Sequence, residues 1–316
     1  MPPMRFAIAI PQFYADGQFE PEHFRAYLNR AEELGFESAW TQEAVLGTAP
    51  QGTTPQLAPL EAMAYAAACT SRLRLGCVVF VTPLHSPVHL AKALSTLDQL
   101  SRGRLEVGIG TGGKARPFAA FGITTDRYIA RFTEGLALMK ALWTEPRVTF
   151  DGEFWQLNDA AMEPKPAQKP HPPVWFGAST EPALRRAVRL GDGFFGAGSS
   201  PTASFAGQVQ IVRQALAEAG REPGSFPIAK RIYIAVDDDA GRARERINDA
   251  MERIYGRRIP SIEAAAVAGT AADCIREVNA VAAAGAELIL FTTIFDQPEQ
   301  MERLAAEVMP HVRIPD

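Results

Sequence analysis

Four small residues, Gly177, Ala178, Ser179 and Thr180, separate the apolar run at 174–176 from a segment with helical periodicity. A strand that stops here and continues as a helix leaves backbone N–H groups of the first helical turn without intrahelical partners. These groups, the positive end of the helix dipole and two hydroxyl side chains suit an anion, often a phosphate. In the alternative interpretation, Ser179 or Thr180 only caps the helix and binds no ligand.

A second turn of small residues, at 108–113, follows another apolar run and reads GIGTGG. Glycine at a strand end allows a ligand to lie against the backbone, so we expect Gly110 and Thr111 to contact such a ligand. The turn resembles a dinucleotide fingerprint, but no helix follows at once and the preceding unit is not the first βαβ unit of the chain. The other interpretation is a plain glycine turn without a ligand.

Two ionisable side chains, Glu43 and His85, also follow apolar runs. A carboxylate and an imidazole at such positions can transfer protons or orient a substrate, so both are candidate catalytic residues. The simpler account is an exposed loop carboxylate and a histidine that makes a structural hydrogen bond.

Short apolar runs alternate with longer segments that have a period of about 3.6 residues along the whole chain, which predicts alternating strands and helices. The predicted strands are 6–11, 38–41, 73–81, 104–109, 174–176, 193–197, 228–236 and 287–292. The predicted helices are 21–34, 58–70, 87–100, 126–143, 182–190, 202–219, 240–255, 271–284 and 298–309. This α/β pattern indicates a (β/α)8 TIM barrel, with a doubly wound open sheet as the alternative. In a barrel, chemistry belongs to the loops that follow the strands.

We expect one domain over residues 1–316, with excursions from the barrel near 146–172 and 237–270. The first excursion contains Asp151-Gly152 between alternating apolar residues, which predicts a β-hairpin.

The 316-residue chain is 47% hydrophobic and 22% charged and has a formal charge of −4. It lacks a basic block interleaved with aromatic residues, so we expect no nucleic-acid partner. Three scattered cysteines, Cys69, Cys77 and Cys274, indicate neither a disulfide framework nor a metal site. No apolar run approaches the length of a membrane span or of a signal sequence, so we expect a cytoplasmic protein without membrane contact.

Three stretches, 73–112, 121–143 and 172–193, closely resemble the luciferase-like monooxygenase superfamily, whose members bind reduced FMN or the deazaflavin F420. The resemblance runs from about residue 6 to about residue 310. It implies a (β/α)8 barrel with the cofactor ring at the C-terminal mouth and the cofactor phosphate at 177–180. It further implies a cis peptide between Val78 and Val79 that supports the ring. The residues alone are equally compatible with an ordinary buried parallel strand at this position.

Three departures from the superfamily pattern bear on substrate and mechanism. Ala44 stands where luciferases and F420-dependent sugar-phosphate dehydrogenases carry a functional histidine. Gly113 stands where the sugar-phosphate dehydrogenases place a catalytic glutamate, and Ser200 lies near the position of their phosphate-binding lysine. A sugar phosphate is therefore not the expected substrate. Aromatic residues near the predicted mouth loops suggest an apolar substrate pocket or ordinary core packing, namely Phe13, Tyr14, Phe118, Phe195 and Phe295.

The resemblance thus implies an oxidoreductase that uses F420 or reduced FMN on a small, apolar organic substrate, by hydride transfer or monooxygenation. F420 is slightly favoured because the GIGTGG turn lacks the arginine that luciferases place there for the FMN phosphate. A separate cofactor reductase and a homodimer are the expected partners. Two rivals are a non-catalytic flavin-binding barrel and a phosphate-handling aldolase or isomerase. The second of these requires a lysine or a carboxylate pair at strand ends, and the predicted ends of the second, fourth, sixth and eighth strands offer no lysine.

Overall fold

Eight parallel strands close into a barrel in the computed structural model, which describes residues 4–13, 18–46, 55–113 and 118–313. Each strand pairs with the next, β8 pairs with β9, and β11 returns to β1. The closed ring confirms the TIM-barrel prediction and rules out the open sheet, and each predicted strand lies within two residues of an observed one. The barrel strands are β1 (Arg5–Ala9), β2 (Ser38–Thr41), β3 (Arg74–Val81), β4 (Leu105–Gly110), β7 (Val174–Gly177), β8 (Gly193–Gly196), β9 (Ile228–Val236) and β11 (Leu288–Thr292).

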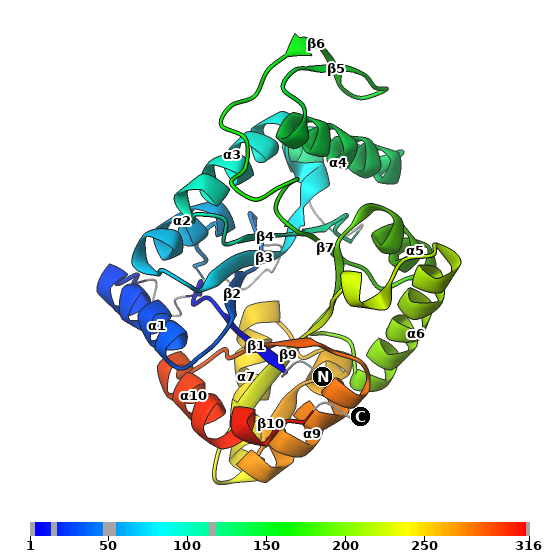
Figure 1. Ribbon diagram of the computed structural model, residues 1–316. Helices are drawn as coiled ribbons and strands as arrows, with labels where there is room; N and C mark the ends of the chain where they lie inside the picture. Colours follow the sequence, from blue (N-terminus) through cyan, green and yellow to red (C-terminus); the bar gives the residue numbers. More distant parts are fainter. Residues whose placement is uncertain (1–3, 14–17, 47–54, 114–117, 314–316) are drawn as a thin grey trace.

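Helices surround the strands as an outer layer (Figure 1). Pro21, Pro59 and Pro87 each occupy a first-turn position, where the missing N–H is not needed. The last predicted helix is shorter than expected, because its α-helical part continues as a π-helical turn over Leu304–Val308. The helices are α1 (Pro21–Glu33), α2 (Pro59–Cys69), α3 (Pro87–Leu100), α4 (Tyr128–Thr144), α5 (Glu181–Leu190), α6 (Thr202–Glu218), α7 (Ala240–Tyr255), α8 (Pro260–Glu263), α9 (Ala271–Ala283) and α10 (Gln297–Arg303).

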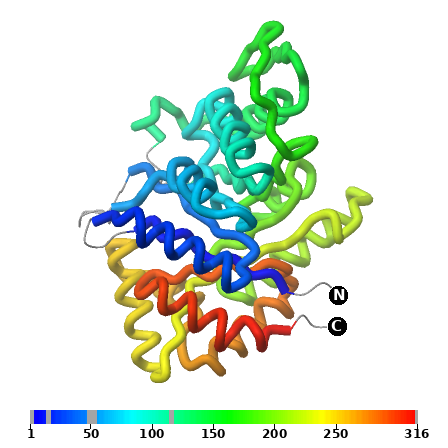
Figure 2. Tube along the Cα trace, turned by 60° about the vertical axis from the view of Figure 1, so that its left-hand side comes forward, coloured from blue at the N-terminus to red at the C-terminus, as the bar shows by residue number. Residues whose placement is uncertain are grey.

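The predicted hairpin is present as β5 (Val148–Asp151) and β6 (Gln156–Ala160) and stands outside the helix layer (Figures 1 and 2). It is attached to α4, where the Arg131 guanidinium lies 4.7 Å from the Trp155 ring centroid. A ninth parallel strand, β10 (Val267–Gly269), was not predicted and extends the sheet alongside β9. Three residues with one partner carry too little pattern to be recognised as a strand.

Three aromatic rings fill the middle of the barrel. Trp40 lies 4.8 Å from Phe195 and 6.1 Å from Trp175, measured between ring centroids. Glycine on a neighbouring strand makes room for such rings, since a Cβ at Gly193 would lie 2.6 Å from Trp175. The barrel is therefore closed by side chains at its centre, and space for a ligand remains only nearer its ends.

Lys230 on β9 points outward and is 1% exposed. Its ammonium group donates to the carbonyls of Ala197 and Ser200, which fixes the loop after β8, and it lies 5.7 Å from the Phe205 ring centroid. Burial, with a smaller contribution from nearby Arg231, lowers the pKa of Lys230 from 10.5 to about 7.

This lysine makes the free energy of unfolding depend on pH. Above about pH 7 the folded chain loses the Lys230 proton, whereas the unfolded chain keeps it until about pH 10.5, so stability rises with pH in this interval. We expect the stability difference between wild type and Lys230→Met to shift by about 3 kcal/mol in favour of wild type between about pH 6.5 and about pH 9.5. Urea unfolding across this range measures the shift. A constant difference would mean that the two carbonyls keep the ammonium group charged throughout.

Candidate active site at the barrel mouth

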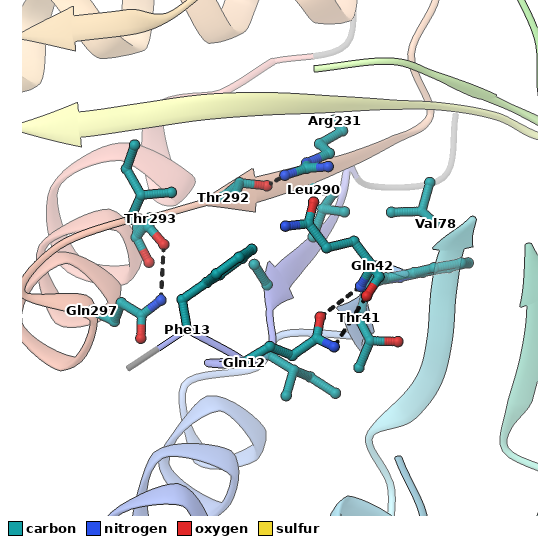
Figure 3. A pocket seen from close by; sticks show the side chains of 14 residues that line it. Gln12, Phe13, Thr41, Gln42, Val78, Arg231, Leu290, Thr292, Thr293 and Gln297 are labelled. Atoms are coloured by element: carbon teal, nitrogen blue, oxygen red, sulfur yellow. Dashed lines mark hydrogen bonds between the residues drawn. The ribbon is translucent and has the colours of Figure 1, made fainter. Parts of the chain in front are cut away.

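A pocket opens among the C-terminal ends of β1, β2, β9 and β11 (Figure 3). This is the end of a TIM barrel where loops build active sites. Its floor includes Trp40 from the aromatic centre. Seven of its fourteen lining residues are apolar and seven are polar. The lining residues are Ala9, Ile10, Gln12, Phe13, Trp40, Thr41, Gln42, Val78, Arg231, Leu290, Thr292, Thr293, Ile294 and Gln297.

Strand β3 is irregular beside this pocket. The peptide between Val78 and Val79 is cis, as the resemblance predicted, and the pairing of β3 with β4 shifts register between Cys77 and Phe80. Val78 lines the pocket. The predicted alternative, an ordinary regular strand, is therefore wrong at this point.

Two of the predicted glycines flank the Val79 side chain. A Cβ at Gly110 would lie 2.7 Å from one Val79 methyl group, and a Cβ at Gly177 would lie 2.8 Å from the other. The fold therefore requires glycine at both positions for internal packing, a reason that the sequence did not indicate. Val78, Val79, Gly110 and Gly177 are brought together at the ends of three adjacent strands, β3, β4 and β7.

The turn at 177–180 leads from β7 into α5, as predicted. Thr180 is the N-cap residue, but its side chain makes no capping hydrogen bond. Its backbone carbonyl accepts from Ala183 at 3.0 Å and from Leu184 at 2.9 Å. Ser179 and Thr180 are exposed, and Ala178 is half-buried. The capping interpretation is thus wrong for Thr180, and both residues are exposed at the positive end of the helix dipole.

Glu43 and His85 lie next to each other, although they are far apart in sequence. One carboxylate oxygen of Glu43 is 2.8 Å from His85 Nε2, and the other accepts from the backbone N–H of Val81 at 2.6 Å. Glu43 is buried and His85 is half-buried, so Glu43 is not the exposed loop charge of the simpler interpretation. Neither residue lines the pocket. Together they connect the segment after β2 to the end of β3.

Thr111 and the aromatic residues that the sequence placed near the barrel mouth do not gather at one place. Thr111 is half-buried after β4, and its hydroxyl donates to the carbonyl of Gly112 at 3.3 Å. Phe13 lines the pocket, whereas Phe195 belongs to the aromatic centre. Phe118 packs near Tyr128, Phe295 lies under Arg246, and Tyr14 is outside the described residues.

Several pocket residues were missed by sequence reasoning. Gln12 fixes the segment after β2, because its amide nitrogen donates to the carbonyl of Gln42 at 3.1 Å and its amide oxygen accepts from the Gln42 N–H at 2.6 Å. Arg231 on β9 was also missed. A signal for it existed, since the alternation of strand residues places Arg231 on the same inward face as Ala229, and a charged residue inside a barrel needs an explanation.

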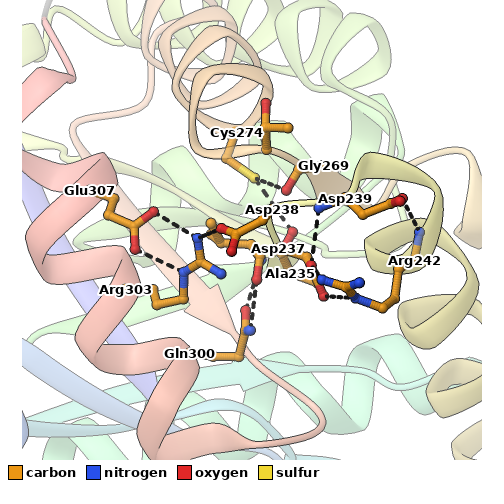
Figure 4. A network of polar contacts seen from close by, with 12 residues as sticks. Ala235, Asp237, Asp238, Asp239, Arg242, Gly269, Cys274, Gln300, Arg303 and Glu307 are labelled. Atoms are coloured by element: carbon orange, nitrogen blue, oxygen red, sulfur yellow. Dashed lines mark hydrogen bonds and ion pairs between the residues drawn. The ribbon is translucent and has the colours of Figure 1, made fainter.

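A polar network lies at the end of β9, away from the pocket (Figure 4). Arg242 pairs with Asp237 and lowers the pKa of that carboxyl group to about 2. The Gln300 amide bonds both the N–H of Val236, at 2.8 Å, and its carbonyl, at 2.9 Å. Arg303 pairs with Asp238 at 2.8 Å. These carboxylates are held by arginines, so the network joins β9 to α7 and α10.

Across the described ranges, no group of acidic, histidine and cysteine side chains is arranged to hold a metal ion. Nor does any described helix combine the length and the apolarity that a bilayer crossing needs.

The closed barrel and the partly polar pocket at its C-terminal mouth make this pocket the candidate site of a TIM-barrel protein. The sequence profile of the luciferase-like monooxygenase family matches residues 4–288, and the chain belongs to this family.

Two relatives and one solved structure illustrate how similar the chain is to other proteins. The chain is 33% identical over 239 residues to an F420-dependent glucose-6-phosphate dehydrogenase from Kineococcus radiotolerans, covering 72% of this chain and 68% of that protein. It is 30% identical over 217 residues to an FMNH(2)-dependent dimethylsulfone monooxygenase from Pseudomonas putida, covering 68% and 58%. The crystal structure of monooxygenase RslO1 from Streptomyces bottropensis aligns with a TM-score of 0.81 at 26% identity, covering 98% and 99%. The sequence alignments thus span between about half and two thirds of such curated relatives.

Proposed function

We propose that this protein is an oxidoreductase that binds F420 or reduced FMN at the barrel mouth and acts on a small, apolar organic substrate. The observation that carries the proposal is the placement of Val79 between Gly110 of β4 and Gly177 of β7, next to the uncapped start of α5, while the adjoining Val78 lines the pocket. Relatives that use each of the two cofactors support the same class of reaction.

The residues present fit a cofactor with a flat ring and a phosphate group. The exposed hydroxyls of Ser179 and Thr180 and the positive end of the α5 dipole would hold the phosphate. Val78 and Val79, with the backbone at Gly110 and Thr111, would support the ring. When bound, the cofactor supplies the redox chemistry, by hydride transfer with F420 or by oxygen activation with FMN. The apolar part of the pocket lining, including Phe13, Trp40 and Leu290, would contact the substrate.

F420 is the cofactor that we favour. The turn after β4 offers no arginine for an FMN phosphate within Gly108–Gly113, and an F420-dependent relative is among the most similar proteins. The substrate is expected to differ from that relative's sugar phosphate, because Ala44, Gly113 and Ser200 replace the ionisable groups expected at those positions. With FMN, a separate reductase would be needed. A homodimer and a cytoplasmic location remain predictions.

Glu43 and His85 are proposed to act as positioning residues. Their mutual hydrogen bond, and the Glu43 bond to Val81, hold the end of β3 directly after the Val78–Val79 peptide. Neither side chain lines the pocket, and both would act on the predicted ring site indirectly, by holding β3 in place.

One observation favours a second candidate, a barrel that binds the cofactor without catalysis. Ala44 is exposed after β2 and carries no ionisable group, and the neighbouring Glu43 is engaged with His85. Tight cofactor binding with no turnover of any reductant or substrate would favour this candidate.

Separate titrations of the purified protein with F420 and with FMN test the proposal. We expect saturable quenching of cofactor fluorescence, with tighter binding of F420. Tighter binding of FMN would reverse the cofactor preference. Binding of neither, in their oxidised or reduced states, would rule out the proposed function.

The anion site has its own test in Ser179→Asp. We expect this substitution to weaken cofactor binding by about tenfold or more, because the new carboxylate repels the phosphate. Ser179→Ala removes only one hydroxyl donor and should weaken binding by about threefold. Ser225→Asp adds the same charge at an exposed position between α6 and β9 and should leave affinity unchanged. Equal affinity of Ser179→Asp and wild type would show that the phosphate binds elsewhere.

A further inference from the structure

Arg231 is a cationic side chain in the pocket whose partners are not carboxylates. Its Nε donates to the Thr292 hydroxyl at 3.0 Å, and one Nη donates to the Tyr233 hydroxyl at 3.1 Å. The guanidinium also lies 4.8 Å from the Tyr233 ring centroid. Within the described parts of the chain, these contacts leave the positive charge without a paired anion.

The contacts fix the orientation of the guanidinium and leave donors free. Arginine carries five N–H donors in one plane, and two of them are used by Thr292 and Tyr233. The Tyr233 hydroxyl is itself held by Tyr255 at 2.7 Å. The guanidinium is therefore preorganised, and among the described residues two hydrogens on Nη1 and one on Nη2 have no partner and can bind an oxyanion with two oxygens.

The surroundings of Arg231 strengthen its attraction for an anion. Phe13, Trp40, Val78 and Leu290 line the same pocket and lower the local dielectric constant. In Figure 3 the side-chain amide of Gln42 points toward the same part of the pocket as the guanidinium, and it adds a neutral donor. The site thus combines one fixed cation with an apolar wall.

We propose that Arg231 binds the charged group of the substrate, and that the substrate is a small organic monoanion, a carboxylate or a sulfonate with an apolar body. This inference rests on the proposed function and changes one part of it: the body of the substrate remains apolar, but one end of the molecule is negatively charged. The apolar wall holds the body of the molecule near Val78, beside the proposed ring site. Arg231 would thereby determine which end of the molecule faces the cofactor.

Ligand-observed NMR titrations with benzoate, benzenesulfonate and benzamide test the proposal. Benzoate and benzamide have nearly the same shape and differ in charge, so we expect at least one anion to bind wild type about tenfold more tightly than benzamide. The better of the two anions identifies the charged group. Rising salt should weaken the binding of the anions but not of benzamide.

Variants assign the effect to the guanidinium. Arg231→Met should remove the preference for anions, whereas Arg231→Lys should retain part of it, because an ammonium group keeps the charge without the planar fork. Arg276→Met, an exposed substitution on α9, is the control and should bind like wild type. Thermal melts identify any variant that does not fold. For such a variant, the test is the affinity of wild type for the anions relative to benzamide, together with its salt dependence.

Cofactor titrations of the same variants separate this inference from the proposed function. The affinity of Arg231→Met for F420 and FMN should stay within about twofold of wild type. If Arg231→Met loses cofactor affinity as much as it loses anion affinity, the guanidinium belongs to the cofactor site and the inference is overturned. Equal binding of benzoate, benzenesulfonate and benzamide by wild type would also overturn it. Anion preference without binding of either cofactor would support the anion site and reject the proposed function.

Discussion

Replacing Gly108 by alanine is expected to leave the barrel barely stable or unable to fold. Gly108 lies on β4, and its missing side chain faces the backbone of β3. A Cβ there would overlap the carbonyl oxygen of Cys77, which is a backbone atom and cannot rotate away. The parallel pairing of Cys77 with Val107 holds the two strands together at this point. Relief would require β3 and β4 to separate next to the Val78–Val79 peptide.

Inserting one methyl group into a packed core commonly costs about 1–3 kcal/mol, and a clash with backbone exceeds that range. We therefore expect Gly108→Ala to lower the free energy of unfolding by about 4 kcal/mol or more, measured by urea unfolding. Gly207→Ala is the matched control, because a Cβ at that position on α6 meets no atom within 4 Å. It should stabilise the protein slightly, by up to about 1 kcal/mol. A Gly108→Ala variant as stable as wild type would contradict the described contact between β3 and β4.

Replacing Glu43 by alanine is expected to have the next largest effect. The Glu43 carboxylate is buried and is the hydrogen-bond acceptor described for the N–H of Val81. Its removal leaves the buried N–H of Val81 without its acceptor and the half-buried ring of His85 without this hydrogen bond. A buried donor without an acceptor costs about 1–3 kcal/mol, and more when a charged group is involved. We expect Glu43→Ala to lower the free energy of unfolding by about 3 kcal/mol.

Glu43→Gln distinguishes positioning from catalysis. The amide oxygen can still accept from Val81, so the loss of stability should fall to about 1 kcal/mol. If Glu43 is a positioning residue, cofactor affinity in the two variants should decline in the same order as stability, with Glu43→Gln near wild type. If Glu43 instead transfers a proton, Glu43→Gln should abolish turnover while cofactor affinity stays near that of wild type and the loss of stability stays at about 1 kcal/mol. Steady-state kinetics beside thermal unfolding separates the two outcomes.

Local signals in the sequence were sufficient for the barrel itself. Buried strands such as β7 and β11 stand out as apolar runs, and prolines at 21, 59 and 87 mark helix starts, because each signal depends on neighbouring residues. Gly191 and Gly193 are a local signal of the same kind, because they mark the end of α5 and the beginning of β8. Strand β10 gave no such signal, because its pairing with β9 depends on residues about thirty positions away.

Some features of the candidate site were likewise predicted from the sequence, and others were not. The turn at 177–180 and the cis peptide at Val78–Val79 were predicted, the first from strand-to-helix chemistry and the second from the family resemblance. The hydrogen bond between Glu43 and His85 was not, because no local pattern indicates which side chains at the ends of two strands face each other.

What the sequence by itself determined is therefore the succession of elements, the family and the turn where a cofactor phosphate is proposed to bind. Only the tertiary structure decided that Gly110 and Gly177 enclose Val79, that Glu43 is buried against β3, and that Arg231 enters the pocket without a carboxylate partner among the described residues. The physical reason is that secondary structure follows from interactions within a few residues, whereas a binding site follows from closure of the barrel. Closure places side chains from β1, β3, β9 and β11 within contact distance, and the register that does so is a property of all eight strands together.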